Sequence, residues 1–548
     1  METFALILIV AVAVLASYPL AKWARIVPLP VVQIAVGAAL AWPVANTVHA
    51  DFEPEVFLLI FIPPLLFIDA LQAPKREFWR MRGSIGSMAF GLVFFTILAF
   101  GYALHWLVPQ VPLAVAFAAA AVLSTTDAVA VSSIVDKEKL PAPMLHLLEG
   151  ESLLNDASGL VMFRFAVAAA LTGAFSLFDA SKAFLFALAA GAGAGLACIW
   201  IAAKAIKVLS KTGPSADEAQ VLVLTLLPFM AYLLAERWHA SGVIAAVVAG
   251  MFSARIGLLR HTGVSGRMLV FSTMQMTSFA LNGAIFVVLG LQLPAITRAV
   301  PVELTTRHWL FEPIVVIVML TLCLMALRYV FLVIGGKTGT LTNRAFGWRH
   351  HRFTNRMKIA TSVAGVRGAI TLAGVLSLPL ALNDGTPFPA RDLVIFLAAG
   401  VILCWLAIAT VALPWLTRDL AHDGHEAAAL ELKGARIAAA NAAIMRLGEL
   451  SATAGPDDRT ITVRQSVAEG LIAGYRRRIA ALEQGREMTP EDRAGQEAWV
   501  ELRRAANDAE AAELRKLLLA GEINDHTSQK IFRELMLDQA ALTAKGRA

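Results

Sequence analysis

The sequence predicts an all-α polytopic membrane protein that continues into a polar helical tail. Hydrophobic residues make up 58% of the 548 residues and charged residues only 16%, whereas soluble globular proteins carry roughly 45–50% and about 25%. The charge is also distributed unevenly. Residues 1–417 contain 48 charged side chains, whereas the much shorter stretch 418–548 contains 40. We therefore expect a transmembrane domain at 1–417 and a separate helical domain at 418–548.

The apolar part of the chain is divided into segments that are each long enough to cross a bilayer. A transmembrane helix needs about 20 predominantly apolar residues, because the hydrocarbon core is about 30 Å thick. About thirteen segments meet this requirement, at 2–20, 28–46, 55–71, 83–106, 111–134, 147–173, 183–203, 218–235, 240–256, 274–293, 310–334, 358–381 and 391–416.

The loops between these segments predict the orientation of the chain. Counted with the residues at the span ends, the loops after the odd-numbered spans hold 20 Lys and Arg, and those after the even-numbered spans hold 5. Basic residues concentrate in cytoplasmic loops. We therefore expect the N-terminus outside, the tail in the cytoplasm, and the protein in the cell inner (plasma) membrane.

A few ionisable side chains interrupt the predicted spans. A charge near the bilayer centre costs at least about 2.5–3.5 kcal/mol, so such residues mark ion paths, proton relays or internal ion pairs. For Arg164, Arg328 and Glu149 we favour a structural salt bridge. The candidates for function are Asp69, Asp127, Glu151, Asp156 and Arg367.

The fifth and sixth predicted spans place two acids near the middle of the membrane. Asp127 follows Thr126 in the fifth span, and the sixth contains Glu151 to Asp156. Ser152 lies three positions before Asn155 and four positions before Asp156, so the three side chains share one face of the helix. Hydroxyl, amide and carboxylate oxygens are ligands of hard cations, and a carboxylate also accepts a proton. One site that holds either a cation or a proton is the simplest chemistry for exchanging them.

The twelfth predicted span contains Gly365-Val-Arg-Gly368, a pattern that favours a break lining a cavity. It lies seven spans after the fifth. An odd offset reverses the direction of crossing, so the two spans are expected to be related as inverted repeats, and interrupted helices at matching positions mark a transporter site.

Several motifs together resemble one family. The Thr126-Asp127 step, the Glu-Ser-Leu-Leu-Asn-Asp run at 151–156 and the Gly-Val-Arg-Gly at 365–368 are similar to the sodium/proton exchanger branch of the monovalent cation:proton antiporters. The run from Phe61 to Ala70 and the segment with Asn282 and 286–291 fit the third and tenth spans of that family. The resemblance covers about residues 1–417.

The resemblance implies an ion- and proton-binding site. Asp156 would be the main carboxylate, with Asn155 beside it, and Asp69 falls where bacterial members often have Glu. A Na+ ion would bind at Asp156, Asp127, Thr126 and Ser152.

The resemblance also implies the architecture. Glu151 and Arg367 would form a structural ion pair between the sixth span and the unwound twelfth. The fold would consist of inverted six-helix repeats with two unwound crossing helices, assembled as a homodimer in membrane lipid. Transport would follow elevator-like alternating access, with no cofactor and no enzymatic activity.

We predict a Na+/H+ antiporter for pH and sodium homeostasis, with a K+/H+ antiporter on the same scaffold as the alternative. The alternatives from other functional classes are a cation channel and an intramembrane hydrolase with Ser265 as its nucleophile. The net charge of +6 does not indicate a nucleic-acid partner, because the basic residues lie in loops between spans.

The tail is predicted to form helices at about 426–453, 461–486, 491–519 and 527–542. We favour a small helical bundle or a dimerising tail over a regulator that responds to pH or ions.

Overall fold

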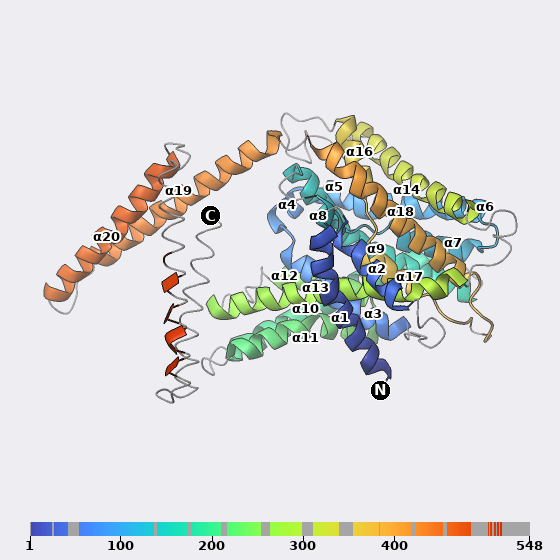
Figure 1. Cartoon of the computed structure of the whole chain (residues 1–548), viewed down its shortest axis with the longest axis horizontal. Helices are drawn as coiled ribbons and strands as arrows, with labels where there is room; N and C mark the ends of the chain where they lie inside the picture. The colour runs from blue at the N-terminus through green and yellow to red at the C-terminus, as the bar shows by residue number, and fades with distance from the viewer. Residues whose placement is uncertain are drawn as a thin grey trace. The chain divides into compact units, whose positions relative to one another are not determined.

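The computed structural model describes most of the apolar part of the chain and the first two helices of the tail. The described residues are 2–24, 27–41, 54–135, 140–172, 177–209, 216–253, 264–298, 311–338, 354–382, 384–418, 422–452, 458–483 and ten positions between 502 and 517. The chain divides into two compact units, Met1–His425 and Glu426–Ala548 (Figure 1).

The regular secondary structure of the described residues in the first unit is helical, apart from one β-bridge between Ala381 and Pro387. Its first helices are α1 (Glu2–Ala24), α2 (Leu29–Ala41), α3 (Pro54–Gln72), α4 (Lys75–Arg80), α5 (Arg82–Gly86), the π-helix η1 (Ser87–Leu92), α6 (Val93–Leu107), α7 (Leu113–Ser124) and α8 (Ala128–Ile134). The rest are α9 (Ala142–Thr172), α10 (Leu177–Leu209), α11 (Ala216–Arg237), α12 (Gly242–Ser253), α13 (Val264–Arg298), α14 (Phe311–Thr338), α16 (Asn355–Val363), α17 (Ala369–Leu376) and α18 (Arg391–Thr417).

These helices fall on all thirteen predicted segments, so the all-α class is confirmed. By length and apolar composition, eight helices of the described residues can cross a membrane, or nine if the bent α7–α8 pair is one span. The helices α2, α3 and α12 are apolar but shorter. The protein is a multi-pass membrane protein, and thirteen crossings stay a prediction.

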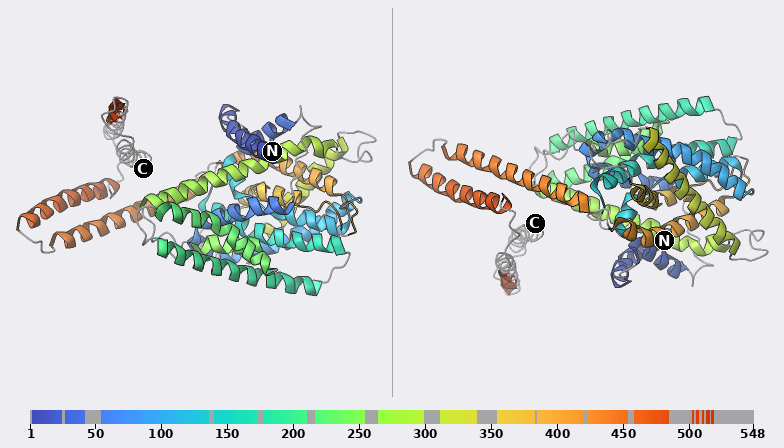
Figure 2. Two further views of the ribbon diagram at one scale, coloured as in Figure 1. Left: turned by 90° about the horizontal axis from the view of Figure 1, so that it is seen from below. Right: turned by 90° about the horizontal axis from the view of Figure 1, so that it is seen from above.

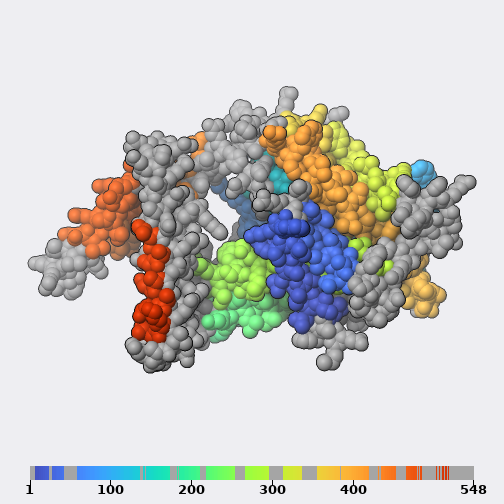
Figure 3. Space-filling model, viewed as in Figure 1, coloured from blue at the N-terminus to red at the C-terminus, as the bar shows by residue number. Residues whose placement is uncertain are grey.

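Apolar side chains cover much of the outside of this unit. On α1, for example, five large apolar residues are more than half exposed: Ile7, Leu8, Val12, Leu15 and Trp23. The blue surface of α1 is in view in Figure 3. Such a face suits a lipid environment, since in water large exposed apolar patches favour association.

The helices of the first unit pack as two groups. The first group contains α1, α2, α3 and α10 to α13, and the second contains α5 to α9, α14 and α16 to α18. Within each group every helix packs against several of the others, whereas fewer contacts join the groups. Figure 1 shows α10, α11 and α13 in the lower part of the unit and α14, α16 and α18 in the upper right.

Glycines allow helices within the first group to approach closely. A Cβ on Gly290 of α13 would overlap with the Ile34 carbonyl of α2, and a Cβ on Gly37 would overlap with the Val287 carbonyl. These neighbours are backbone atoms that cannot turn away. The contact between α2 and α13 therefore depends on the missing side chains.

A polar contact joins the two groups near the end of α9. Arg164 Nη1 donates to Glu236 Oε1 of α11 over 2.6 Å, and its Nη2 donates to the Tyr232 hydroxyl over 2.7 Å. Glu236 also accepts from the Gly242 amide at the start of α12 over 3.2 Å. The structural salt bridge predicted for Arg164 is therefore confirmed.

The second unit begins as a pair of helices. The helices α19 (His422–Ala452) and α20 (Asp458–Glu483) run side by side (Figure 2). Lys433 Nζ donates to the Glu483 carbonyl over 3.2 Å, which joins the early part of α19 to the end of α20. The first two tail helices fall where they were predicted. The helix predicted at 491–519 is described only at scattered positions, and the one at 527–542 lies outside the described residues.

We expect Gly290→Ala to destabilise the protein by about 1–3 kcal/mol, because the added methyl group overpacks the α2–α13 contact. The measurement is thermal unfolding of the purified protein in detergent. The matched control is Gly193→Ala on α10, where nothing lies within 4 Å of an added Cβ, and this variant should be unchanged or slightly more stable because Ala favours helix. Equal melting temperatures for the two variants would contradict the prediction.

Candidate functional site

The site lies where two helices are broken. One chain segment leaves α7 at Ser124 and re-enters helix at Ala128, with a bend of 53° between α7 and α8. The other leaves α16 at Val363 and re-enters helix at Ala369. Both breaks were predicted. The non-helical stretches meet directly, because the Asp127 amide donates to the Val366 carbonyl over 2.8 Å.

Asp127 caps both helices that begin at this crossing. Its Oδ1 accepts from the amides of Val129 and Ala130 in α8 over 2.7 and 3.0 Å, and its carboxylate also accepts from the Ala369 amide of α17. A carboxylate at a helix N-terminus offsets the positive end of the helix dipole. Gly368 makes room for it, since a Cβ there would overlap with the Asp127 carboxylate.

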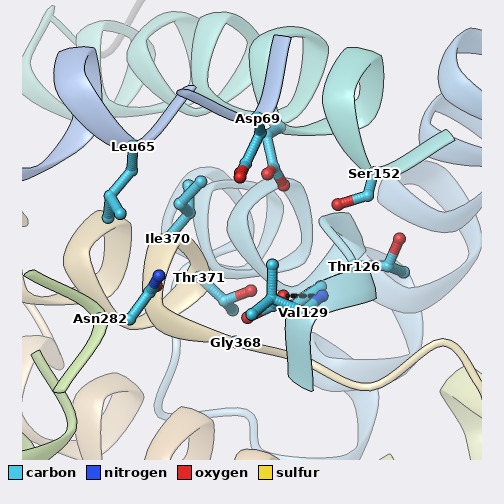
Figure 4. Close-up of a pocket in the computed structure, with 11 residues that line it drawn as sticks. Leu65, Asp69, Thr126, Val129, Ser152, Asn282, Gly368, Ile370 and Thr371 are labelled. Carbon is cyan, nitrogen blue, oxygen red and sulfur yellow. Dashed lines mark hydrogen bonds between the residues drawn. The ribbon is translucent and has the colours of Figure 1, made fainter. Parts of the chain in front are cut away.

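A pocket opens beside the crossing. Its lining comes from both helix groups and consists of Leu65, Asp69, Thr126, Asp127, Val129, Ser152, Asp156, Asn282, Gly368, Ile370 and Thr371. Asp69 and Asn282 belong to α3 and α13 of the first group, and the acids and hydroxyls on the other side belong to the second (Figure 4). The pocket therefore lies on the boundary between the two groups.

Asp156 is the carboxylate of this pocket that α9 supplies, and it is 4% exposed. The charges that act on it are mostly of its own sign: Asp127, Asp69 and Glu151 are acids, and Arg367 is the opposing base. An ionised carboxylate buried among other acids is unfavourable unless a positive charge joins it. Either a proton or a cation meets this need.

Hydrogen bonds hold α9 against the unwound stretch after α7. Asn155 Nδ2 donates to Thr126 Oγ1 over 2.7 Å, and Thr126 Oγ1 in turn donates to Glu151 Oε1 over 3.5 Å. Ser152 Oγ accepts from the Ala128 amide over 3.4 Å. Five of the six predicted ion-site residues line the pocket, and the sixth, Asn155, fixes the Thr126 side chain.

The predicted ion pair between Glu151 and Arg367 is wrong, because Glu151 pairs with Arg328 of α14. Arg328 Nη1 and Nη2 donate to the two carboxylate oxygens of Glu151, the second over 2.7 Å, and Arg328 Nε donates to the Thr361 carbonyl over 3.0 Å. The Glu151 and Arg328 side chains are 0% and 2% exposed. The structural role that we favoured for Arg328 is confirmed.

Arg367 turns elsewhere because its backbone is unwound. Its Nη1 donates to the Gly365 carbonyl over 2.8 Å, and its guanidinium lies 4.4 Å from the centre of the Trp405 ring. Gly365 also makes room for Arg328, whose Cδ would lie 2.9 Å from an added Cβ. Arg367 still contributes a positive charge near Asp156.

For Glu149 the structure shows a partner on its own helix. Its Oε2 lies 3.8 Å from His146 Nδ1 one turn earlier in α9. This contact is an ion pair only when His146 is protonated.

Two polar residues of the pocket, Asn282 and Thr371, were not predicted as site residues. Asn282 was used only as a motif residue, and its Nδ2 donates to Ser278 Oγ over 3.2 Å. Thr371 follows the Gly365–Gly368 break, and its Oγ1 lies 2.7 Å from Thr125 Oγ1. For Thr371 the available signal was its position in an interrupted span, and for Asn282 it was an amide side chain within an apolar span.

Broken helices that cross around buried acids, in a protein with many membrane helices, define a transporter of small cations. A family model described as sodium/hydrogen exchanger, transmembrane, matches residues 8–419. The chain belongs to this family. It is therefore a membrane transporter and not an enzyme.

Known relatives cover much or nearly all of the chain. A protein of Escherichia coli K12 named "Uncharacterized Na(+)/H(+) exchanger YjcE" is 39% identical over 522 residues, 94% of each chain. A Bacillus subtilis protein named as a sodium, potassium, lithium and rubidium/H+ antiporter is 39% identical over 428 residues, which are 76% of this chain and 62% of that protein.

A solved structure has the same fold. The sodium proton antiporter MjNhaP1 from Methanocaldococcus jannaschii superposes with a TM-score of 0.57 at 18% identity, over 77% of this chain and 100% of that one.

We expect Arg328→Ala to cost about 3–5 kcal/mol of stability, because it leaves the buried Glu151 carboxylate without its partner. Thermal unfolding in detergent measures the loss. The double variant Glu151→Leu with Arg328→Met should recover most of it, since an apolar pair of similar size needs no partner. A wild-type melting temperature for Arg328→Ala would show that the pair has no structural role.

Proposed function

We propose that the chain exchanges Na+ for protons across the membrane by alternating access, in the service of pH and sodium homeostasis. The observation that carries this proposal is the buried Asp156 carboxylate, which shares a pocket with Asp69 and Ser152 and lies among like charges. The family membership agrees with it.

Coupling follows from competition for one carboxylate. Facing the cytoplasm, Asp156 loses its proton and a cation takes the place of that proton. Facing outward, the cation leaves and the carboxylate binds a proton again. The empty ionised form crosses poorly, because a bare charge at the membrane centre costs at least about 2.5–3.5 kcal/mol. Each crossing therefore carries either a cation or a proton.

The hydrogen bonds suggest a division of roles among the predicted site residues. Asp156, Asp69 and Ser152 are the direct ligands that we propose. Thr126 completes the shell from the unwound stretch while Asn155 holds its hydroxyl. Asp127 supports the site by capping α8 and α17, since its carboxylate already accepts from three backbone amides.

The two helix groups provide a basis for alternating access. The proposed ion ligands come from both helix groups. When one group shifts past the other, the pocket between them opens to the opposite side of the membrane. The close glycine contacts between α2 and α13 lie within the first group and do not oppose such a shift. This arrangement supports the elevator-like movement that the family resemblance implies.

Sodium is the cation that the two relatives have in common, since both are named for it. The Bacillus subtilis relative is also named for potassium, lithium and rubidium. Exchange should therefore be measured with a series of cations.

The setting that we propose is the cell inner membrane, with the N-terminus outside and the tail at 418–548 in the cytoplasm. The distribution of Lys and Arg between the loops supports this orientation. The chain would work as a homodimer surrounded by lipid, and the pairing of α19 with α20 is consistent with a helical tail that dimerises or regulates.

We expect Asp156→Asn to abolish exchange, because the amide holds neither a proton nor a cation in the manner of a carboxylate. The measurement is Na+-driven proton movement in proteoliposomes, with a pH-sensitive dye inside. The control is the same substitution at the exposed Asp384 in the turn before α18, which should leave exchange unchanged. Exchange retained by a folded Asp156→Asn variant would refute the site.

The cation series tests the transported ion and the mechanism together. Gradients of Na+, K+ and Li+ at several pH values should each be applied to the wild-type protein, and Na+ should drive proton movement. Proton movement with K+ alone would contradict the sodium assignment. A cation current that needs no opposing proton gradient would identify a channel instead.

A further inference from the structure

We propose that the Thr371 hydroxyl oxygen is a ligand of the transported cation and helps to set which cation the site prefers. This inference rests on the exchange function proposed above and adds a residue to its site. The added residue belongs to α17, which follows the second break. The family resemblance implied no ion ligand on this helix.

Thr371 is placed in the pocket and not merely near it. It lies in the first turn of α17, is 2% exposed, and lines the pocket together with Asp156 and Ser152. In Figure 4 it lies between Ile370 and Val129, on the same side of the pocket as Gly368. Its oxygen therefore approaches the pocket from the side opposite Asp69.

The direction of the Thr371 hydroxyl follows from counting protons. Thr125 Oγ1 donates to the Val122 carbonyl over 2.8 Å. A hydroxyl has one proton, so Thr125 has none left for its 2.7 Å contact with Thr371 Oγ1. Thr371 must therefore be the donor in that contact. Its own proton points at Thr125, and both lone pairs of its oxygen stay available as acceptors.

Such an oxygen is suited to a cation. A hydroxyl whose proton is fixed elsewhere acts as an acceptor only, and uncharged oxygens of this kind are ordinary ligands of hard cations. The Thr126 hydroxyl, in the stretch between α7 and α8, differs from that of Thr371. It both accepts from Asn155 and donates to Glu151. Thr371 is therefore better prepared for ligation than Thr126 is.

The packing of α17 also fixes the position of this oxygen. A Cβ on Gly374, one turn after Thr371, would lie 2.8 Å from a Val122 methyl carbon, so α17 packs closely on α7. A ligand on a rigid support favours the ion whose radius fits the distance, since selectivity depends on cavity size, ligand number and flexibility. Loss of one such oxygen should weaken binding of small, strongly hydrated ions more than of large ones.

The test uses three variants of the full-length protein in proteoliposomes. Thr371→Val keeps the shape and removes the oxygen, whereas Thr371→Ser keeps the oxygen. Thr125→Val breaks the same hydroxyl contact from the other side and leaves the Thr371 oxygen in the pocket. The half-saturating concentrations of Na+, Li+ and K+ are measured for each variant and for the wild type.

We expect Thr371→Val to raise the half-saturating Na+ concentration about tenfold, the effect of losing one polar contact to a charged group. The rise should be larger for Li+ than for K+. Thr371→Ser should stay close to the wild type. Thr125→Val frees the Thr371 proton but keeps the oxygen, so its loss should be smaller than that of Thr371→Val. Na+-induced stabilisation against heat in detergent gives a second readout, because a bound ligand raises the melting temperature, and it should be smaller in Thr371→Val.

Three outcomes would overturn the inference. One is wild-type half-saturation in Thr371→Val, and another is an equal loss in Thr371→Val and Thr125→Val, which would show that the hydroxyl pair matters only for packing. If Thr371→Val does not fold, the smaller Thr371→Ala replaces it, and wild-type values there would overturn the inference equally. Failure of the proposed function is distinguishable, since the wild-type protein itself would then not exchange cations.

Discussion

The Asp127 carboxylate lies where two helices begin, and the electrostatic field in the pocket depends on the hydrogen bonds that this carboxylate accepts. The N-termini of α8 and α17 both point at this position, and their positive dipole ends would repel a cation in the adjacent pocket. Asp127 offsets both ends through hydrogen bonds to Val129, Ala130 and Ala369. With that charge neutralised, the field at the pocket is set by Asp156 and Asp69, and a cation can replace a proton there.

A second buried charge pair holds the helices that present these groups. Glu151 of α9 and Arg328 of α14 bind each other through both carboxylate oxygens, and Arg328 also binds the end of α16 at Thr361. One guanidinium thus joins three helices around the crossing. The pair therefore fixes where the broken ends lie relative to Asp156, five residues further along α9.

Much of this could be predicted from the chain, because the signals are local. Apolar length predicted the helical segments, Gly365 and Gly368 predicted a break, and helical spacing placed Ser152 with Asp156. The partner of Glu151 could not be predicted in this way, because Arg328 is 177 residues away and the unwound backbone turns Arg367 aside. The Thr371 hydroxyl likewise depends on Thr125, 246 residues away.

The contact between Arg164 and Glu236 has a consequence for the resting state. It joins the two helix groups, so a movement of one group past the other must lengthen it. Arg164 lies inside the apolar span 143–172, where a charge that loses its partner is costly. Opening the contact therefore has an energetic cost. The pair holds the transporter in the conformation seen here without entering the pocket.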